Sequence, residues 1–411
     1  MMEDNRRIWV ISEVYYPDEA GGAHFMTQLA EGLTQFFDVS VLCGYPSYTH
    51  RGDALPVKSI RNKVMLERCY GTFFNRKIFI FRLINILTIS VSIFFKTLYK
   101  IRRQDIVIVV TTPPLLPFVV LVACILRRTK CILRIDDVYP EALIAAGIIN
   151  QQSKAASFLS WMNRLLYSNV DRIVVLGRDM KHLIVKKLKK CHDKTIIIQN
   201  WADLDVVFPA PKSENFLLQE LGLANKFIVQ CAGNMGLAQD IETMFKAIGL
   251  LKENVNIHFL FIGSGAKRQL MENEVSDKKL SNVTILDQRN RSDQHNFLNA
   301  CDIAMVSLIY GMKGAGVPSR MYNIMASGKP IIAISEFESE LSMVIEEEKV
   351  GWSVLPGNFT HLAEVILEAY SNHSTLVEMS GRARAAALTK YSSKLLIDKY
   401  YEMIKNMSVN I

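Results

Sequence analysis

Two kinds of hydrophobic pattern alternate along the chain. Short apolar runs, typical of strands buried on both faces of a parallel sheet, are separated by longer segments with apolar residues at helical spacing. This alternation predicts an α/β fold with parallel sheets and right-handed crossovers. The expected strands are residues 8–12, 38–42, 106–110, 131–135, 172–175 and 195–198 in the first half, and 227–232, 257–262, 283–286, 303–306, 331–334 and 351–354 in the second.

The alternation is interrupted near the middle of the chain. Pro209 and Pro211 break the pattern within residues 199–214, which we interpret as a linker. A chain of 411 residues is long enough for two domains of ordinary size. We therefore expect an N-terminal domain at residues 1–200, a C-terminal domain at 201–390 and a last helix within 391–411.

Residues 311–335 contain the most informative local pattern. Gly314 and Gly316 leave backbone N–H groups unshielded, and Pro318 suits the first turn of a short helix. A bare loop that leads into a helix N-terminus favours anions, and Arg320 adds a positive charge there. An ordinary α/β loop with an arginine explains the pattern equally well.

Two further strand-to-helix turns carry glycines. The segment Gly233-Asn234-Met235-Gly236 follows one expected strand, and Gly263-Ser264-Gly265 follows the next. Arg268 stands where the dinucleotide fingerprint requires its third glycine, so the second turn is weak evidence for NAD. Three glycine-bearing turns in one half of the chain predict a doubly wound sheet with a nucleotide at its carboxyl edge.

Six segments in this order resemble glycosyltransferase family 4, in particular its branch for bacterial surface-polysaccharide and O-antigen synthesis. They are residues 16–22 (YPDEAGG), 136–141 (DDVYPE), 200–203 (NWAD), 233–236 (GNMG), 263–265 (GSG) and 317–330 (VPSR to ASGKP). The resemblance covers nearly the whole chain. It implies the GT-B fold, in which two Rossmann-like doubly wound domains face each other across a cleft, with the last helix packing back on the N-terminal domain.

The resemblance also implies an activity. It is the retaining, metal-independent transfer of a hexosyl or N-acetylhexosaminyl group from a nucleotide sugar, UDP-linked by first choice and GDP-linked by second. The N-terminal domain would bind the acceptor and the C-terminal domain the nucleotide sugar, which is a co-substrate, so no cofactor is expected.

The resemblance and the loops together predict the site residues. Catalysis is expected of Asp136, Asp137 and Arg320, although an N-cap role or an ion pair with Arg134 explains Asp137 equally well. Acceptor binding is expected of His24 and Glu141. Donor binding is expected of Gly21, Gly22, Gly233, Asn234, Gly236, Ser264, Gly265, Lys313, Gly316, Pro318, Ser319 and Asn323.

Four positions depart from the family pattern. Ala315 and Asn323 replace two glutamates, while Asn234 and Gln239 replace an arginine and a lysine. These departures keep a non-catalytic nucleotide-sugar-binding scaffold subunit as an alternative. A nucleotide-sugar epimerase on the same fold is a second alternative.

Charge and cysteine content restrict the partners and the compartment. Residues 1–200 hold 28 Lys and Arg against 16 Asp and Glu, a net charge of +12, whereas residues 201–411 hold 20 against 24, a net charge of −4. A basic N-terminal half indicates an anionic surface, and without a nucleic-acid motif a membrane leaflet is the better candidate. The seven cysteines are scattered singly, which favours a reducing cytoplasm and predicts no zinc site.

Two apolar segments bear on the membrane hypothesis. Residues 78–99 are flanked by basic residues and interrupted by Arg82 and Lys96, and residues 115–126 are shorter still. Either they are core helices, or the first lies in a membrane interface. Residues 178–194 are a further basic amphipathic candidate, and no signal peptide is visible. We expect a peripheral protein on the cytoplasmic face of the inner membrane, acting on a polyprenyl-diphosphate-linked or other lipid-linked saccharide.

Overall fold

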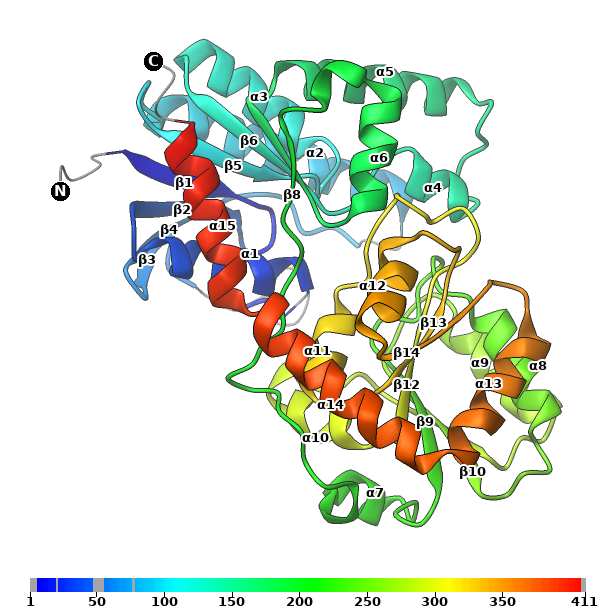
Figure 1. The fold of residues 1–411 in the computed structure, drawn as a ribbon. Coiled ribbons are helices and arrows are strands. Elements are labelled where there is room, and N and C mark those ends of the chain that lie inside the picture. The colour runs from blue at the N-terminus through cyan, green and yellow to red at the C-terminus, as the bar shows by residue number, and fades with distance from the viewer. Residues whose placement is uncertain (1–5, 20, 47–54, 76–77, 408–411) are drawn as a thin grey trace. The chain divides into compact units, whose positions relative to one another are not determined.

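The computed structural model describes residues 6–19, 21–46, 55–75 and 78–407, which form two compact units (Figure 1). Unit 1 comprises Met1–Tyr139, Lys154–Gln199 and Lys394–Ile411, and unit 2 comprises Pro140–Ser153 and Asn200–Ser393. Each unit contains one sheet of mainly parallel strands with helices packed on it, as the hydrophobic pattern predicts.

Unit 1 is built on an eight-stranded sheet with the order β3-β4-β2-β1-β5-β6-β7-β8. All neighbouring strands are parallel except β3 and β4. The strands are β1 Arg7–Ile11, β2 Asp38–Gly44, β3 Lys58–Arg61, β4 Val64–Cys69, β5 Ile106–Val110, β6 Lys130–Ile135, β7 Arg172–Val175 and β8 Thr195–Ile197. The six predicted strands of the first half are confirmed, with ends that differ by at most two residues.

The hairpin of β3 and β4 is the part of this sheet that the hydrophobic pattern did not predict. Its two-residue turn is Asn62-Lys63, and both residues have positive φ (45° and 68°), as such hairpins require. Side chains of β3 alternate between exposed and partly buried because this strand lies at the sheet edge. An edge strand with polar residues has no apolar run, so the pattern carried no signal for it.

The helices of unit 1 cover both faces of its sheet. They are α1 Gly21–Leu33, α2 Phe79–Lys100, α3 Leu116–Arg127, α5 Lys154–Asn169, α6 Arg178–Lys187, the 3-10 helix η1 Lys189–Cys191 and α15 Ser393–Asn406. The last helix packs on this unit because the Tyr400 hydroxyl accepts a hydrogen bond from Arg134 Nη1 at 2.9 Å. Tyr401 stacks on Phe36 at 4.2 Å.

The strand register assigns α2 and α15 to opposite faces. Glu67 of β4 pairs with Lys96 and Lys100 of α2, at 3.0 Å and 2.5 Å. Register across the sheet places Glu67 and Leu133 in one row, so the adjacent Arg134 points to the other face, toward α15.

Helix α2 is not the core helix that one interpretation of the sequence offered. Only 28% of its most apolar 18-residue window is buried. Among the described residues it is the one helix that is long and apolar enough, by length and composition alone, to cross a membrane. Its exposed apolar side chains therefore need another explanation.

Unit 2 is built on a six-stranded, fully parallel sheet with the order β11-β10-β9-β12-β13-β14. The strands are β9 Phe227–Ala232, β10 Ile257–Ile262, β11 Val283–Leu286, β12 Ile303–Ser307, β13 Ile331–Ile334 and β14 Gly351–Val354. All six coincide with the predicted strands to within one residue, because strands buried on both faces read as continuous apolar runs.

Helices and two apolar cores flank this sheet. One core packs α11 and α14 against one face, and the other packs α8 and α13 against the opposite face. The helices are α4 Glu141–Ala145, η2 Lys212–Glu214, α7 Phe216–Glu220, α8 Ile241–Leu250, α9 Arg268–Asp277, η3 Arg291–Asp293, α10 Gln294–Asn299, α11 Arg320–Ala326, α12 Glu340–Glu348, α13 Phe359–Ser371 and α14 His373–Lys390.

Candidate functional site

The strand order of unit 2 defines where a ligand is expected. From β9 the chain passes to β10 on one side, and it later returns to β12 on the other side of β9. The carboxyl ends of β9 and β12 therefore flank a topological switch point, where open α/β sheets bind their ligands. The predicted glycine loop at Gly233 and the loop that leads to Arg320 both lie at this edge.

Arg320 and Gly233 are packed against each other at the switch point. The guanidinium donates through Nη1 to the carbonyl of Ala232 and through Nη2 to the carbonyl of Asn234, each at 3.3 Å. Gly233 has φ +125°, which favours glycine, and a Cβ there would lie 3.3 Å from Arg320 Cζ, so a larger residue would also press on the guanidinium. Burial lowers the pKa of Arg320 from its ordinary value, but an arginine remains charged at neutral pH.

The two glycine turns of this unit interlock. A Cβ on Gly263 would lie 1.9 Å from the carbonyl oxygen of Gly233, and one on Gly265 would lie 2.4 Å from that of Met235. Met235 N–H in turn donates to the Ser264 carbonyl at 2.9 Å. The glycines of the β10 turn thus serve close backbone packing, which explains them without a dinucleotide.

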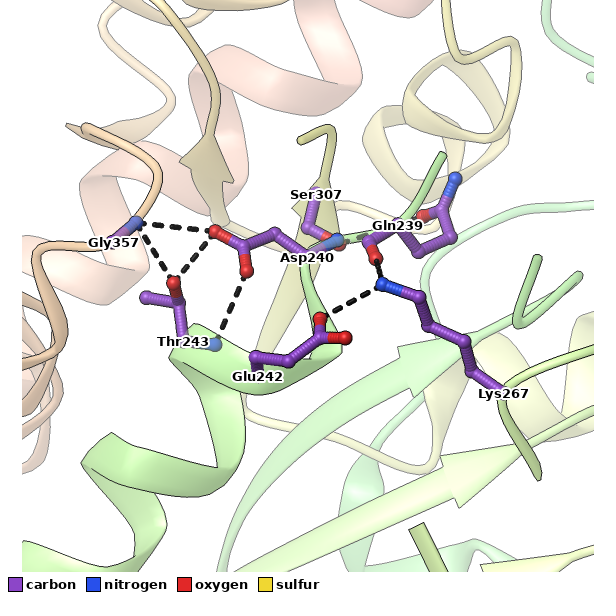
Figure 2. A network of polar contacts seen from close by, with 7 residues as sticks. All are labelled: Gln239, Asp240, Glu242, Thr243, Lys267, Ser307 and Gly357. Carbon is purple, nitrogen blue, oxygen red and sulfur yellow. Dashed lines mark hydrogen bonds and ion pairs between the residues drawn. The ribbon is translucent and has the colours of Figure 1, made fainter. Parts of the chain in front are cut away.

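A polar network around Asp240 joins four loops at this edge of the sheet (Figure 2). Asp240 caps α8, because its Oδ1 accepts from Thr243 N–H at 3.1 Å and its Oδ2 from the Thr243 hydroxyl at 2.6 Å. Its own N–H donates to Ser307 Oγ at 3.2 Å, and Gly357 N–H donates to its Oδ2 at 3.2 Å.

Asp240→Ala is expected to destabilise the protein by about 1–2 kcal/mol, since it removes an N-cap and a partner of Gly357 N–H. It should also raise the KM for the nucleotide sugar that the resemblance predicts, because the loop after β14 loses a hydrogen bond to the loop after β9. Urea unfolding and donor titration measure the two effects. Asn215→Ala, which removes the N-cap of α7, is the matched control, and an unchanged KM in both variants would contradict the prediction.

Lys267 brings a cation to the position where the family pattern has a lysine and this chain has Gln239. Its Nζ donates to the Gln239 carbonyl at 2.8 Å and pairs with Glu242 at 2.8 Å (Figure 2). Lys267 lies in the turn after β10, one loop away in sequence from Gln239. No sequence motif indicated this juxtaposition, because it depends on how two loops pack.

Lys313 does not present a free positive charge. Its Nζ pairs with Glu338 at 2.7 Å, while Glu336 Oε2 accepts from the N–H groups of Gly311 and Lys313 at 2.8 Å and 3.2 Å. Glu338 has φ +59°. The loop after β12 is thus held to the residues after β13, and the charge of Lys313 is balanced there.

Asn323 and Ala315, which replace the two family glutamates, are both buried. Asn323 Oδ1 accepts a 2.7 Å hydrogen bond from Asp203 N–H, so it anchors the segment that enters this unit. Ala315 packs with Leu308 and Met312 in a small cluster that includes Ala142 of α4. Neither position therefore offers a carboxylate to a donor.

The remaining predicted donor residues lie around the same loops. Ser264 Oγ donates to Gln288 Oε1 at 3.0 Å, and Asn234 is exposed beside Gly236. Pro318 and Ser319 accept the first backbone hydrogen bonds of α11, from Met321 and Tyr322. Gly316 lies in the loop just before them.

In unit 1, the predicted carboxylates follow the end of β6. The buried Arg134 holds Asp136, with Nε to Oδ1 at 3.0 Å, and Asp136 N–H donates to Thr111 Oγ1 at 3.2 Å. Burial, together with the charge of Asp136, raises the pKa of Asp137 to about 6. One interpretation of the sequence was an ion pair between Asp137 and Arg134. In the structure Arg134 pairs with Asp136 instead.

The predicted donor residues Gly21 and Gly22 and the predicted acceptor residues His24 and Glu141 lie in the first turns of helices. Gly21 and Gly22 form the first turn of α1 rather than a loop, and a Cβ on Gly21 would meet no described atom within 4 Å. His24 lies in the same helix, edge-on to Phe25. Glu141 begins α4, which belongs to unit 2.

Comparison with solved structures identifies the class of fold. Alr3699/HepE from Anabaena, solved in complex with UDP and glucose, superposes with a TM-score of 0.75 at 13% identity, covering 98% of this chain and 100% of that chain. Together with the two parallel sheets, this likeness shows a GT-B glycosyltransferase fold.

Sequence comparison then gives the family. Residues 214–386 match the family Glycosyl transferases group 1. WbjE of Pseudomonas aeruginosa, which is named as a glycosyltransferase, is 32% identical over 306 residues, which cover 74% of this chain and 76% of WbjE. WcaI of Escherichia coli (strain K12), assigned to glycosyl transfer in colanic acid biosynthesis, is 24% identical over 83% of this chain and 86% of its own length. The chain belongs to the group 1 glycosyl transferases.

Proposed function

We propose that this enzyme transfers a sugar, with retention and without a metal ion, from a UDP-linked donor to a lipid-linked saccharide in bacterial surface-polysaccharide synthesis. The observation that carries the proposal is the Arg320 guanidinium packed on Gly233 at the switch point of unit 2. A fixed cation beside a bare backbone turn suits a leaving nucleoside diphosphate, whose charge grows in the transition state.

Similar proteins support the donor and the pathway. HepE binds UDP and glucose with the same fold, and WcaI is assigned to the synthesis of colanic acid, a surface polysaccharide. Arg320 is the primary phosphate ligand in this proposal, and Lys267 has a smaller role, because Glu242 pairs with it at 2.8 Å. Lys313 has a smaller role, because Glu338 balances its charge.

The acceptor hydroxyl is assigned to the carboxylates at the end of β6. Asp137, with a pKa near 6, is placed to take a proton close to neutral pH, which is the range that suits a general base. Asp136 is held by Arg134 and orients the acceptor.

Membrane attachment is assigned to one face of unit 1, which we call the α2–α3–α5 face. Helix α3 contacts both α2 and α5, and exposed basic residues such as Arg82, Arg103 and Arg128 flank the apolar side chains. The apolar side chains of this face, each at least 44% exposed, are Ile80, Leu83, Leu87, Val91, Phe95, Tyr99, Val122, Ile125, Leu126, Phe158, Trp161 and Leu165. Apolar and aromatic side chains rimmed by cations suit the interface of an anionic bilayer on the cytoplasmic side.

The double variant Leu87→Glu/Phe95→Glu is expected to lose vesicle binding by roughly tenfold or more, because two exposed apolar side chains that would enter the bilayer become charged. Co-sedimentation with phosphatidylglycerol vesicles measures it. Val377→Glu/Leu388→Glu, at similarly exposed positions of α14, is the matched control. Equal binding by both double variants would reject this face as the attachment surface.

A nucleotide-release assay tests the transfer reaction itself. Purified enzyme is mixed with UDP- and GDP-sugars, with and without membranes that carry lipid-linked acceptor. Acceptor-dependent UDP release supports the proposal. Conversion of the donor sugar without acceptor would instead indicate an epimerase, and tight donor binding with no release across the panel would indicate a scaffold subunit, which the absence of carboxylates at Ala315 and Asn323 favours.

A further inference from the structure

A cavity of about 530 Å³ opens in unit 1, away from all the predicted site residues. It is lined by residues at the amino ends of strands, including Arg7 of β1 and Asp38 of β2, and by Arg102 and Asp105, which precede β5. Asp136 and Asp137 follow the carboxyl end of β6. Since these strands are parallel, the cavity lies at the opposite edge of the sheet from the acceptor carboxylates.

The floor of the cavity is one cross-strand row of side chains. Trp9, Ser40, Met65 and Ile60 are register neighbours on β1, β2, β4 and β3. Met65 and Ile60 are 50% and 76% exposed, whereas Ser40 is 2% exposed. The Ser40 hydroxyl is buried and has no hydrogen-bond partner among the described residues. The floor thus combines apolar surface with one unused polar group, which calls for a partner.

The cations around the cavity exceed the free carboxylates. The side chains of Arg7, Lys58 and Arg102 make no hydrogen bond or ion pair with any described residue, and Lys100 completes the basic set.

Two of the three lining carboxylates are already satisfied. Glu67 is paired with Lys96 and Lys100, and Asp105 accepts from Trp9 Nε1 and from Arg102 N–H, both at 2.9 Å. The donors to Asp105 are neutral, so Asp38 and Asp105 oppose the three unengaged cations, which still exceed them. The remaining electrostatic preference of the cavity is for an anion.

We propose that this cavity binds the phosphate-bearing headgroup of an anionic lipid. Arg7, Lys58 and Arg102 hold the phosphate, Ser40 meets a headgroup oxygen, and Met65 and Ile60 contact the apolar part. The cavity reaches the last residue of α2, Lys100, and so adjoins the α2–α3–α5 face. The choice of a lipid rests on the membrane attachment proposed above, whereas the anion preference does not.

Titration calorimetry on the full-length protein tests the site with three soluble probes: dihexanoyl phosphatidylglycerol, dihexanoyl phosphatidylcholine and inorganic phosphate. We expect the phosphatidylglycerol to bind most tightly. The triple variant Arg7→Gln/Lys58→Gln/Arg102→Gln should weaken it roughly tenfold or more. The control Lys394→Gln/Lys399→Gln/Lys405→Gln removes the same charge from α15, on the other face of the sheet, and should bind as the wild type does.

Three results would overturn the assignment: equal binding of the two lipids, equal loss in the triple variant and its control, or phosphate binding as tight as phosphatidylglycerol, which would make free phosphate the ligand. If the triple variant fails to fold, Ser40→Ala serves instead, because the Ser40 hydroxyl has no partner to lose, and a several-fold loss is expected. Nucleotide release is measured separately, so failure of this site and failure of the proposed transferase are distinguishable.

Discussion

Arg320→Ala should reduce kcat by roughly 10²- to 10³-fold, the usual loss when one preorganised charge donor is removed from a transition state. The guanidinium is held by the carbonyls of Ala232 and Asn234 and packs on Gly233, so it needs no rearrangement to meet a diphosphate. Nucleotide release at saturating donor measures the effect. Arg320→Lys should recover only part of the rate, because an ammonium lacks the two-pronged donor geometry.

The control for Arg320 is Arg382→Ala. Arg382 is also hydrogen-bonded to a backbone carbonyl, that of Lys349, but it lies on α14, outside the loops of the candidate site. The Arg382→Ala variant should retain the wild-type kcat. Retention of full activity by Arg320→Ala would remove the phosphate role from this residue and, with it, the observation on which the proposed function depends.

Asp137→Asn should stabilise the protein at pH 8 by on the order of 2–3 kcal/mol while it abolishes most turnover. The pKa of this carboxyl is about 6 in the folded state against an ordinary 3.8, and each unit corresponds to ~1.4 kcal/mol. The folded state therefore binds the proton more tightly, so the wild type loses stability as the pH rises from about 4 to 6 and stays at that lower level above 6. The Asn side chain carries no charge, so the variant avoids the free-energy cost of burying a carboxylate.

Urea unfolding at pH 5 and at pH 8 separates this effect from others. The advantage of the Asn variant should be roughly half of its full value at pH 5 and complete at pH 8. Asp205→Asn, at an exposed position, is the control and should show no such pH-dependent advantage. A constant difference at both pH values would mean that the Asp137 pKa is not raised by burial, and the general-base role would lose its support.

The departures from the family pattern are explained by what surrounds them. Asn323 bonds to the backbone of Asp203, and Ala315 fills a small apolar cluster, so both positions serve the fold. Gln239 stands where the family pattern has a lysine, and Lys267 Nζ donates a hydrogen bond to its backbone carbonyl. The lost glutamates are thus explained by the fold, and Lys267 is itself paired with Glu242.

The sequence by itself determined the two-unit α/β architecture, twelve of the fourteen strands and the glycine turns, because each leaves a local trace. A doubly buried strand is a continuous apolar run, and a turn with positive φ requires glycine at positions such as Gly233. The β3–β4 hairpin left only the Asn62-Lys63 turn as a trace, since an edge strand is free to be polar.

The tertiary structure alone decided which charges are available. Lys313 forms an ion pair with Glu338, and Arg134 forms its ion pair with Asp136 rather than with Asp137. Lys267, from another loop, donates a hydrogen bond to the Gln239 carbonyl. It also decided that α2 is exposed rather than buried in the core. Such outcomes depend on contacts between residues far apart in sequence, and the free energy of a charge depends on those neighbours and on burial, neither of which a local pattern records.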